Sequence, residues 1–275
     1  MTEGFVGSAI IALIHANVVI AVAGAGVTIT ASWVVGHPFA PLPVAVGFAA
    51  VMLAYTINRF TDRVADHHNV PGRAAFVSRH GRLLVSVAAV AYGGVVVITA
   101  FRSPRLLPVL LLPPVLAIGY AVPWVRRFPF VKNAVVGACW AAIPLGVGVY
   151  YGHIGTDIIL VAALIGVLLT IAAMIFDIKD VDGDRHVGTR TIPTRIGPAR
   201  TRLVALVSLL GLLPAVVVAV LVVSPRFAVF GVYVAYLLLA VPFAGSERGP
   251  LYYGGVIDGE HIVVAAAVVA WVLIG

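Results

Sequence analysis

Residues 41–66 read PLPVAVGFAAVMLAYTINRFTDRVAD, and this stretch decides the class of fold. The uncharged run over 41–57 is close to the ~20 residues that a helix needs to cross the hydrocarbon core of a bilayer. Asn58, Asp62 and Asp66 follow at once, each four residues after the last. Side chains at this spacing stack along one face of a helix. The stretch therefore predicts a membrane-spanning helix that continues past the membrane surface and carries a row of polar groups there.

The rest of the chain has the same apolar character. Hydrophobic residues make up 61% of the 275 residues and charged residues only 11%, with a mean hydropathy of +1.09. These values exclude an ordinary soluble domain. We predict an all-α polytopic membrane protein with nine transmembrane helices, the first of them a retained span rather than a cleaved signal. The predicted helices lie near 5–35, 41–57, 83–101, 106–122, 134–151, 158–176, 203–223, 227–244 and 261–275.

The positive charges predict how the chain lies in the membrane, because cytoplasmic loops retain Lys and Arg. With the N-terminus inside, all but three of the 18 Lys and Arg residues fall on the cytoplasmic side, the exceptions being Arg102, Arg105 and Arg226. We therefore expect an integral protein of the cell membrane whose N-terminus and even-numbered loops are cytoplasmic. This orientation also explains the net charge of +7 without a nucleic-acid partner.

A second acidic stretch, MIFDIKDVDGDRH at 174–186, follows the sixth predicted helix. Asp177, Asp180 and Asp184 are spaced three and then four residues apart, so they also share one helix face. Both acidic stretches are predicted to lie on the cytoplasmic side of the membrane. The sequence therefore brings two rows of carboxylates to the same membrane face.

The two acidic stretches also indicate how the chain is organised. Each follows the second helix of a group of four predicted helices. The four-residue spacing of Asp62 and Asp66 recurs in Asp180 and Asp184. This pattern hints at a duplicated bundle with parallel halves. We expect a single transmembrane domain over 1–275, divided into halves of about 1–122 and 131–244 and completed by a last helix.

Stacked carboxylates repel one another, and unpaired charge at the edge of a bilayer is costly. We therefore expect a cation, and Mg²⁺ is the natural candidate because it takes oxygen ligands and binds through carboxylates together with substrate phosphates. Such an ion makes a diphosphate a good leaving group by neutralising the charge that develops as the carbon–oxygen bond breaks. The predicted metal ligands are Asn58, Asp62, Asp66, Asp177, Asp180 and Asp184.

The two acidic stretches also have interpretations other than a metal site. A solvated helix cap, or pairing with nearby Arg, explains either stretch alone, but two matched stretches on one side favour a site. The segment DVDGD resembles part of a calcium loop, yet Thr191 stands where that loop requires Glu. The alternative function is an ion-coupled transporter that binds cations at the acidic clusters. Transport sites usually lie near the bilayer midplane, whereas these acids gather at one face.

The two stretches resemble the motifs of the UbiA superfamily of intramembrane prenyltransferases. That family has Asn-x3-Asp-x3-Asp after its second helix and Asp-x2-Asp-x3-Asp after its sixth, and this chain has both in full. The segment GDRHVGTRTIPTRIG after the second motif is also similar to the family, and Asn17 stands where its first helix tends to keep an Asn. The chain departs from the family at Arg59, where Asp is usual, and at Trp124, which replaces the Lys of a Tyr-x3-Lys pattern that begins at Tyr120.

The resemblance implies nine helices around a central cavity and two Mg²⁺ ions that bridge the motifs to an isoprenyl diphosphate. It also implies transfer of the prenyl group to a lipophilic acceptor, which would make the chain a transferase of isoprenoid lipid biosynthesis. The residues expected to carry the reaction are Asp62, Asp66, Asp180 and Asp184. Asp66 is expected as a metal ligand, because the motif is duplicated at Asp184, or alternatively as the base that removes the acceptor's proton.

Contacts with the substrates are expected from polar side chains near the motifs. Lys132, at the start of the fifth helix, is a candidate ligand of the diphosphate, and Arg73 and Arg195 could neutralise phosphate oxygens. Asn17 and Tyr120 stay open between substrate contact and a packing or interfacial role. With the motif Asn, the expected substrate-binding set is Asn17, Asn58, Arg73, Tyr120, Lys132 and Arg195.

Overall fold

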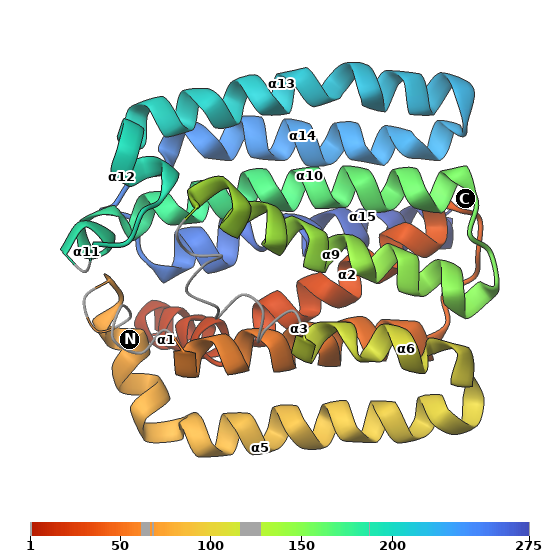
Figure 1. Ribbon diagram of the computed structural model, residues 1–275, viewed down its shortest axis with the longest axis horizontal. Coiled ribbons are helices and arrows are strands. Elements are labelled where there is room, and N and C mark those ends of the chain that lie inside the picture. The colour runs from red at the N-terminus through yellow and green to blue at the C-terminus, as the bar shows by residue number, and fades with distance from the viewer. Residues whose placement is uncertain (1, 62–66, 68, 116–127, 187, 275) are drawn as a thin grey trace.

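The structure of the chain is a computed structural model that describes residues 2–61, 67, 69–115, 128–186 and 188–274. The described residues form helices joined by short loops and contain no strand, which confirms the predicted all-α fold (Figure 1). The helices are α1 (Thr2–His15), α2 (Val18–Val34), α3 (Pro41–Thr61), α5 (Pro71–Arg102), α6 (Leu107–Leu110), α9 (Pro129–Tyr151), α10 (Thr156–Lys179), α11 (Val181–His186), α12 (Ile192–Ile196), α13 (Pro198–Val222), α14 (Val229–Ala240) and α15 (Glu260–Ile274). A π-helix, Leu251–Ile257, leads into α15, and short 3-10 turns cover Pro104–Leu106, Pro225–Ala228 and Val241–Phe243.

The predicted count of nine spans is not confirmed by the described residues. Seven helices are long and apolar enough to cross a membrane, or eight if the bent pair α1 and α2 counts as one span. The apolar segment Pro104–Val115 stands where the fourth span was predicted and is shorter than a full crossing. The remainder of that prediction, 116–122, lies outside the described residues.

The first predicted span is broken rather than continuous. α1 and α2 meet at an angle of 72°. At the break, Asn17 has a φ of 62°, in the left-handed region that interrupts a right-handed helix. Asn tolerates this conformation better than most residues other than Gly. The bend turns α1 towards α5 and the π-helix, and α1 contacts both.

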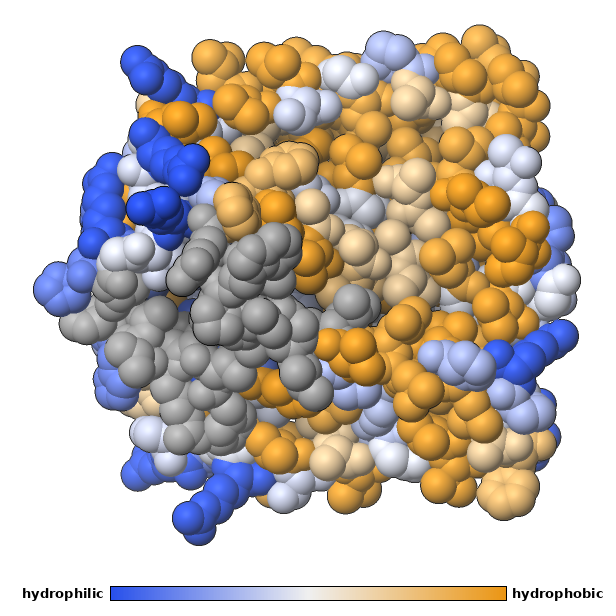
Figure 2. Space-filling view, in the orientation of Figure 1, coloured by the Kyte–Doolittle hydropathy of each residue, from blue (hydrophilic) through white to orange (hydrophobic). Residues whose placement is uncertain are grey.

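The surface is that of a protein immersed in lipid. Orange, apolar side chains cover most of the visible face, and blue, hydrophilic side chains gather at the end that carries α11 and α12 (Figure 2). Bulky side chains such as Val90, Leu221 and Leu239 are at least 75% exposed, which is stable in hydrocarbon but not in water. The N-terminus lies at the α11 end and the C-terminus at the opposite end (Figure 1). The chain is an integral membrane protein.

α10 is the most buried of the seven helices that are each long and apolar enough to cross a membrane, and it packs closely against α9. Small residues allow this approach, as is common between helices in membranes. A Cβ built on Gly137 of α9 would lie 2.2 Å from the carbonyl oxygen of Gly166 in α10. An equivalent approach joins α2 and α3, where a Cβ on Gly24 would lie 2.8 Å from the carbonyl oxygen of Gly47. These contacts bring the helices that precede the two motifs close to their neighbours.

We expect Gly137→Ala to destabilise the protein, because the added methyl group meets backbone that cannot move away without separating α9 from α10. The expected cost is about 1–3 kcal/mol. Thermal unfolding in detergent measures the change. Gly93→Ala is the matched control, because a Cβ at Gly93 of α5 meets no atom within 4 Å. An equal loss of stability in both variants would show that the α9–α10 contact is not special.

Candidate active site

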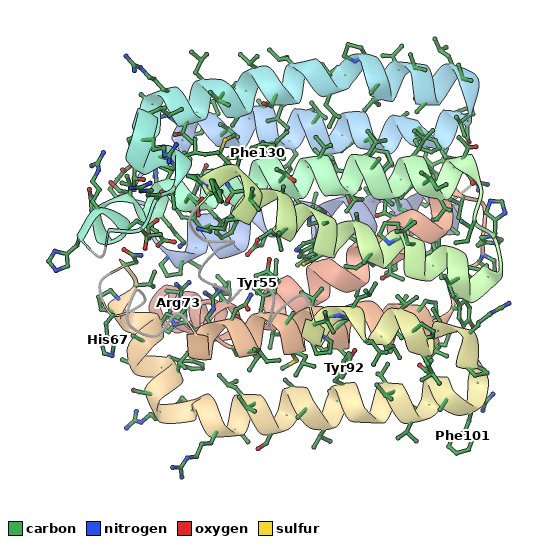
Figure 3. All side chains as sticks on the ribbon, in the orientation of Figure 1. Tyr55, His67, Arg73, Tyr92, Phe101 and Phe130 are labelled. Atoms are coloured by element: carbon green, nitrogen blue, oxygen red, sulfur yellow. The ribbon has the colours of Figure 1, made fainter. Side chains whose placement is uncertain are left out.

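A polar cavity of about 290 Å³ opens at the end of the bundle that carries α11 and α12. Its walls come from α1, α2, α3, α5, α9, α10 and the π-helix segment, so residues far apart in the sequence meet there. Arg73, at the start of α5, lies at this end of the molecule, and Tyr55 lies deeper, towards the middle of the bundle (Figure 3). Seven of the residues predicted for the site line this cavity: Asn17, Asn58, Arg73, Lys132, Asp177, Asp180 and Asp184.

The other predicted site residues are not among the described walls of the cavity. Asp62, Asp66 and Tyr120 lie outside the described residues. Arg195 is exposed on α12 and does not line the cavity. All three aspartates of the second motif therefore line the cavity, whereas Asn58 is the one residue of the first motif in the described part of the site.

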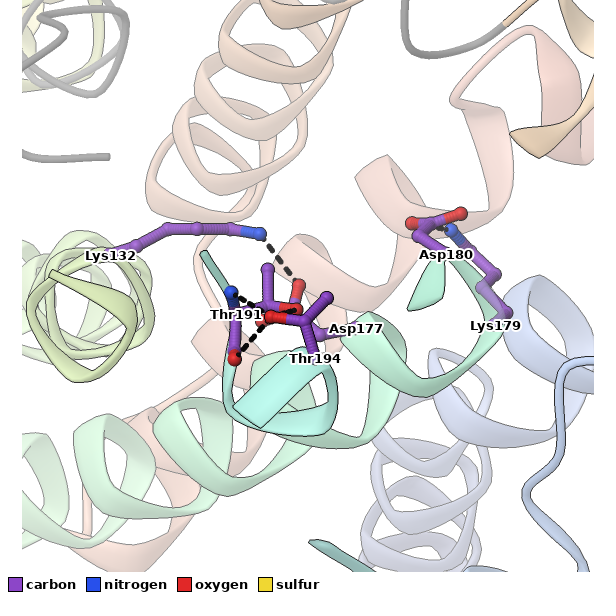
Figure 4. A network of polar contacts seen from close by, with 6 residues as sticks. All are labelled: Lys132, Asp177, Lys179, Asp180, Thr191 and Thr194. Atoms are coloured by element: carbon purple, nitrogen blue, oxygen red, sulfur yellow. Dashed lines mark hydrogen bonds and ion pairs between the residues drawn. The ribbon is translucent and has the colours of Figure 1, made fainter. Parts of the chain in front are cut away.

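Two lysines face the carboxylates of the second motif (Figure 4). Lys132 Nζ, reaching from α9, lies 2.6 Å from Asp177 Oδ1, and both side chains are largely buried. Lys179 Nζ forms an ion pair with Asp180. Because each lysine lies against a carboxylate in a largely buried setting, each pair compensates charge that would otherwise be costly to bury. The same two ammonium groups stand where an anionic substrate would enter.

Burial and neighbouring charge act differently on the two motif carboxylates beyond the end of α10. Burial raises the pKa of Asp184 to about 6, with Lys132 opposing this shift and Asp177 and Asp180 adding to it. Burial would also raise the pKa of Asp180, but the Lys179 ammonium outweighs it and holds that pKa below its usual value. A further positive charge near Asp184 would therefore be needed to hold it ionised at lower pH.

The second motif supplies oxygen atoms suited to a hard divalent cation. Asp177 Oδ2, Asp180 Oδ1 and Asp184 Oδ2 are buried and accept no hydrogen bond from the described protein. Carboxylate oxygens are the ligands that Mg²⁺ prefers. Within the described ranges, which exclude 62–66, no three His, Cys, Asp or Glu side chains are close enough together to hold a metal ion. The donor chemistry thus fits Mg²⁺, and a full ligand set would need groups beyond those described.

Asn17 links the helix break to the first motif. Its Nδ2 donates a hydrogen bond to Thr56 Oγ1 at 3.3 Å, and its Oδ1 accepts one from Arg59 Nε at 3.5 Å. Asn17 is 1% exposed. The side chain therefore has partners on α3 and also lies in the cavity wall, so its packing role is observed and its contact with a substrate stays a prediction.

Sequence reasoning missed several residues that line the same cavity. Lys179 lies between Asp177 and Asp180 of the second motif, but the motif pattern is defined by its acids and assigns no role to this position. Arg59 was noted only as a departure from a family pattern. Asp258 interrupts the last apolar run, and a charged residue in such a run is itself a signal of function. The predicted last span began at residue 261 and left Asp258 out.

A second cavity, of about 110 Å³, adjoins the first and is mostly apolar. It lies between α3, α9 and the segment around α6, and its wall includes Val46, Ala50, Cys139, Trp140 and Gly146. The α6 segment is tied to α5 by a hydrogen bond from the Tyr92 hydroxyl to the Leu110 carbonyl (Figure 3). Tyr55, Asn58 and Val136 line both cavities. The polar cavity and the apolar cavity therefore adjoin at these three side chains.

The geometry combines a charged cavity and an apolar cavity inside a membrane-embedded helical bundle, and comparison with known proteins gives the family of the chain. The model of the UbiA prenyltransferase family matches residues 17–248. The chain belongs to the UbiA prenyltransferase family. The resemblance inferred from the two motifs is thereby confirmed, and the transporter alternative gains no support.

Relatives and solved structures agree with this assignment. A digeranylgeranylglyceryl phosphate synthase of Natronomonas pharaonis is 31% identical over 192 residues, covering 67% of this chain and 68% of the relative. The enzyme of that name from Methanoregula boonei is 30% identical over 153 residues, but the match spans only about half of either chain, 54% of each. The chain is also similar in fold to a UbiA homolog from Archaeoglobus fulgidus, solved bound to GPP and Mg²⁺, with a TM-score of 0.68 and 13% identity over 94% of this chain and 99% of that one.

We expect Lys132→Met to lower the stability of the metal-free protein by about 3 kcal/mol, because Asp177 is left buried without its cation. For a chain of this size the thermal midpoint should fall by about 6–12 °C. Unfolding in detergent with a chelator measures it. The double variant Lys132→Met/Asp177→Asn should recover part of the loss, because both charges are then removed. Strictly additive losses would contradict the coupling of this pair.

Proposed function

We propose that the chain transfers a prenyl group from an isoprenyl diphosphate to a lipophilic acceptor within the membrane. One observation carries this proposal: a polar cavity with basic and acidic walls adjoins an apolar cavity, and Tyr55, Asn58 and Val136 line both. A prenyl diphosphate has the same division between a charged head and an apolar tail. Its reactive carbon, between the two, would lie near the shared residues.

The residues of the polar cavity divide into those suited to a cation and those suited to phosphate. The predicted metal ligands, in both motifs, would hold Mg²⁺, with two ions as the proposed number. Bound there, Mg²⁺ supplies positive charge that stabilises the departing diphosphate. Lys132, Lys179 and Arg73 line the cavity and are the proposed contacts of the phosphate oxygens. Arg248, which also lines the cavity, is a further candidate.

The relatives suggest which substrates to test first. Their name, digeranylgeranylglyceryl phosphate synthase, describes a product with two geranylgeranyl groups on glyceryl phosphate. We therefore propose geranylgeranyl diphosphate as the donor and geranylgeranylglyceryl phosphate as the first acceptor to be tried. The apolar cavity supports a long donor, because Val46 lies about 18 Å along α3 from Asn58 at a rise of 1.5 Å per residue.

We further propose that the motif end of the bundle faces the cytoplasm. The support is the distribution of Lys and Arg in the sequence together with the cavity, which opens at the end where the N-terminus lies. Water-soluble diphosphate and Mg²⁺ would then reach the site from the cytoplasm, while the acceptor and the prenyl tail remain in the bilayer.

The central test is a prenyl-transfer assay on purified protein with geranylgeranyl diphosphate, geranylgeranylglyceryl phosphate and Mg²⁺. We expect activity to be lost in excess chelator and restored better by Mg²⁺ than by Ca²⁺, since Mg²⁺ suits small sites shared by carboxylates and phosphate. Asp62→Asn and Asp180→Asn should each lower turnover by on the order of a hundredfold or more while the protein stays folded.

The control for these variants is His67→Ala, because His67 is exposed near the first motif and has no assigned role (Figure 3). It should keep most of the activity. Full activity in chelator, or a larger loss in His67→Ala than in Asp180→Asn, would show that the metal-dependent reaction has been assigned to the wrong residues.

The apolar cavity gives a separate prediction about the length of the donor. Val46→Trp should narrow this cavity about three helical turns from Asn58, so kcat/KM should fall about tenfold for geranylgeranyl diphosphate and little for dimethylallyl diphosphate. Val90→Trp, at a lipid-facing position 75% exposed on α5, is the matched control. Equal losses with both donors would show that the tail does not lie in this cavity.

A further inference from the structure

The polar cavity contains an acidic side chain that belongs to neither motif. Asp258 follows the π-helix Leu251–Ile257 and lines the cavity. Asp177 and Asp180 are each paired with a lysine. The carboxylate of Asp258, by contrast, forms no hydrogen bond or ion pair with any described residue. It therefore presents an acceptor for a proton or hydrogen bond to whatever occupies the cavity.

Asp258 lines the same polar cavity as Tyr55, Asn58 and Val136, the three side chains that also line the apolar cavity. A prenyl diphosphate lying across the two cavities would bring its first carbon close to these three side chains. An acceptor that meets this carbon from the polar cavity would share that cavity with the Asp258 carboxylate.

The surroundings of Asp258 distinguish it from the motif carboxylates. Lys179 Nζ is paired with Asp180 and lies 5.9 Å from the centre of the Tyr253 ring, on the segment that carries Asp258. This ammonium therefore stands between the second motif and the wall that holds Asp258. A role towards the acceptor suits this position better than a share in the metal site.

We infer that Asp258 is a catalytic residue of the prenyl transfer and accepts the proton of the acceptor. The inference rests on the proposed function. As the carbon–oxygen bond of the donor breaks, its electron pair leaves with the diphosphate. The hydroxyl oxygen of the acceptor forms the new bond to the first prenyl carbon, and its proton passes to the Asp258 carboxylate and then to water in the polar cavity. This assigns to Asp258 the task for which Asp66 was the alternative candidate.

The test separates transfer from ionisation of the donor. Asp258→Asn keeps the shape of the side chain and removes the base. Transfer of the geranylgeranyl group to geranylgeranylglyceryl phosphate should fall by about a hundredfold. Mg²⁺-dependent hydrolysis of the donor to a free prenyl alcohol, measured without acceptor, should stay within about threefold of the unmodified protein. Asp180→Asn should lose both reactions together.

Two variants complete the comparison. Asp157→Asn removes a carboxylate that pairs with His153 away from the cavity and should change neither reaction. Asp258→Glu retains a base displaced by one methylene group, so its ratio of transfer to hydrolysis should fall between those of the unmodified protein and Asp258→Asn. If Asp258→Asn does not fold, as judged by thermal unfolding, the ratio in Asp258→Glu decides.

Each outcome supports or overturns the inference. A lower ratio of transfer to hydrolysis in the Asp258 variants supports it. An unchanged ratio, whether both reactions persist or both fall equally, overturns the role of Asp258 and leaves the proposed function standing. An unmodified protein that neither transfers nor hydrolyses the donor overturns the proposed function and this inference with it.

Discussion

Charge compensation inside a low-dielectric membrane protein is the constraint on which the rest of the site depends. The described walls of the polar cavity hold the carboxylates of Asp177, Asp180, Asp184 and Asp258 and the cations of Arg59, Arg73, Lys132, Lys179 and Arg248. Neither set is stable there alone, because burying an unpaired charge costs several kcal/mol. Together they form a site in which opposite charges offset one another.

Helix packing is what brings these charges together. The close contact of Gly137 with Gly166 holds α9 against α10, and Lys132 and Asp177 lie beyond that contact at the cavity end of each helix. The contact of Gly24 with Gly47 joins α2 to α3 in a corresponding way before the first motif. The division into halves of about 1–122 and 131–244 stays a prediction, and these two contacts fall at matching helix pairs of both halves.

The sequence was informative where one physical signal dominated. Length and hydropathy predicted an all-helical membrane protein, and the spacing of Asp177, Asp180 and Asp184 predicted a shared face. The bend at Asn17 left no such signal, because apolar residues continue on both sides of it. The cavity partners Lys179 and Asp258 depend on which helices meet, and hydropathy carries no information on that. Arg195 looked equivalent to Arg73 in the sequence, and only the fold separates their positions.

The break in the first span has a consequence for the electrostatic potential of the cavity. Because α2 begins at Val18 instead of at the membrane surface, its N-terminal end lies inside the bundle, and Asn17, Val19 and Ile20 line the polar cavity. The first N–H groups of a helix have no partner within it, and the aligned peptide dipoles make this end positive. Unlike an ammonium group, this partial charge cannot be neutralised by a proton or drawn into an ion pair with a motif carboxylate. The same break ends α1 at His15, whose negative helix end also borders the cavity, so the kink sets a fixed pair of opposed partial charges beside the ionisable side chains.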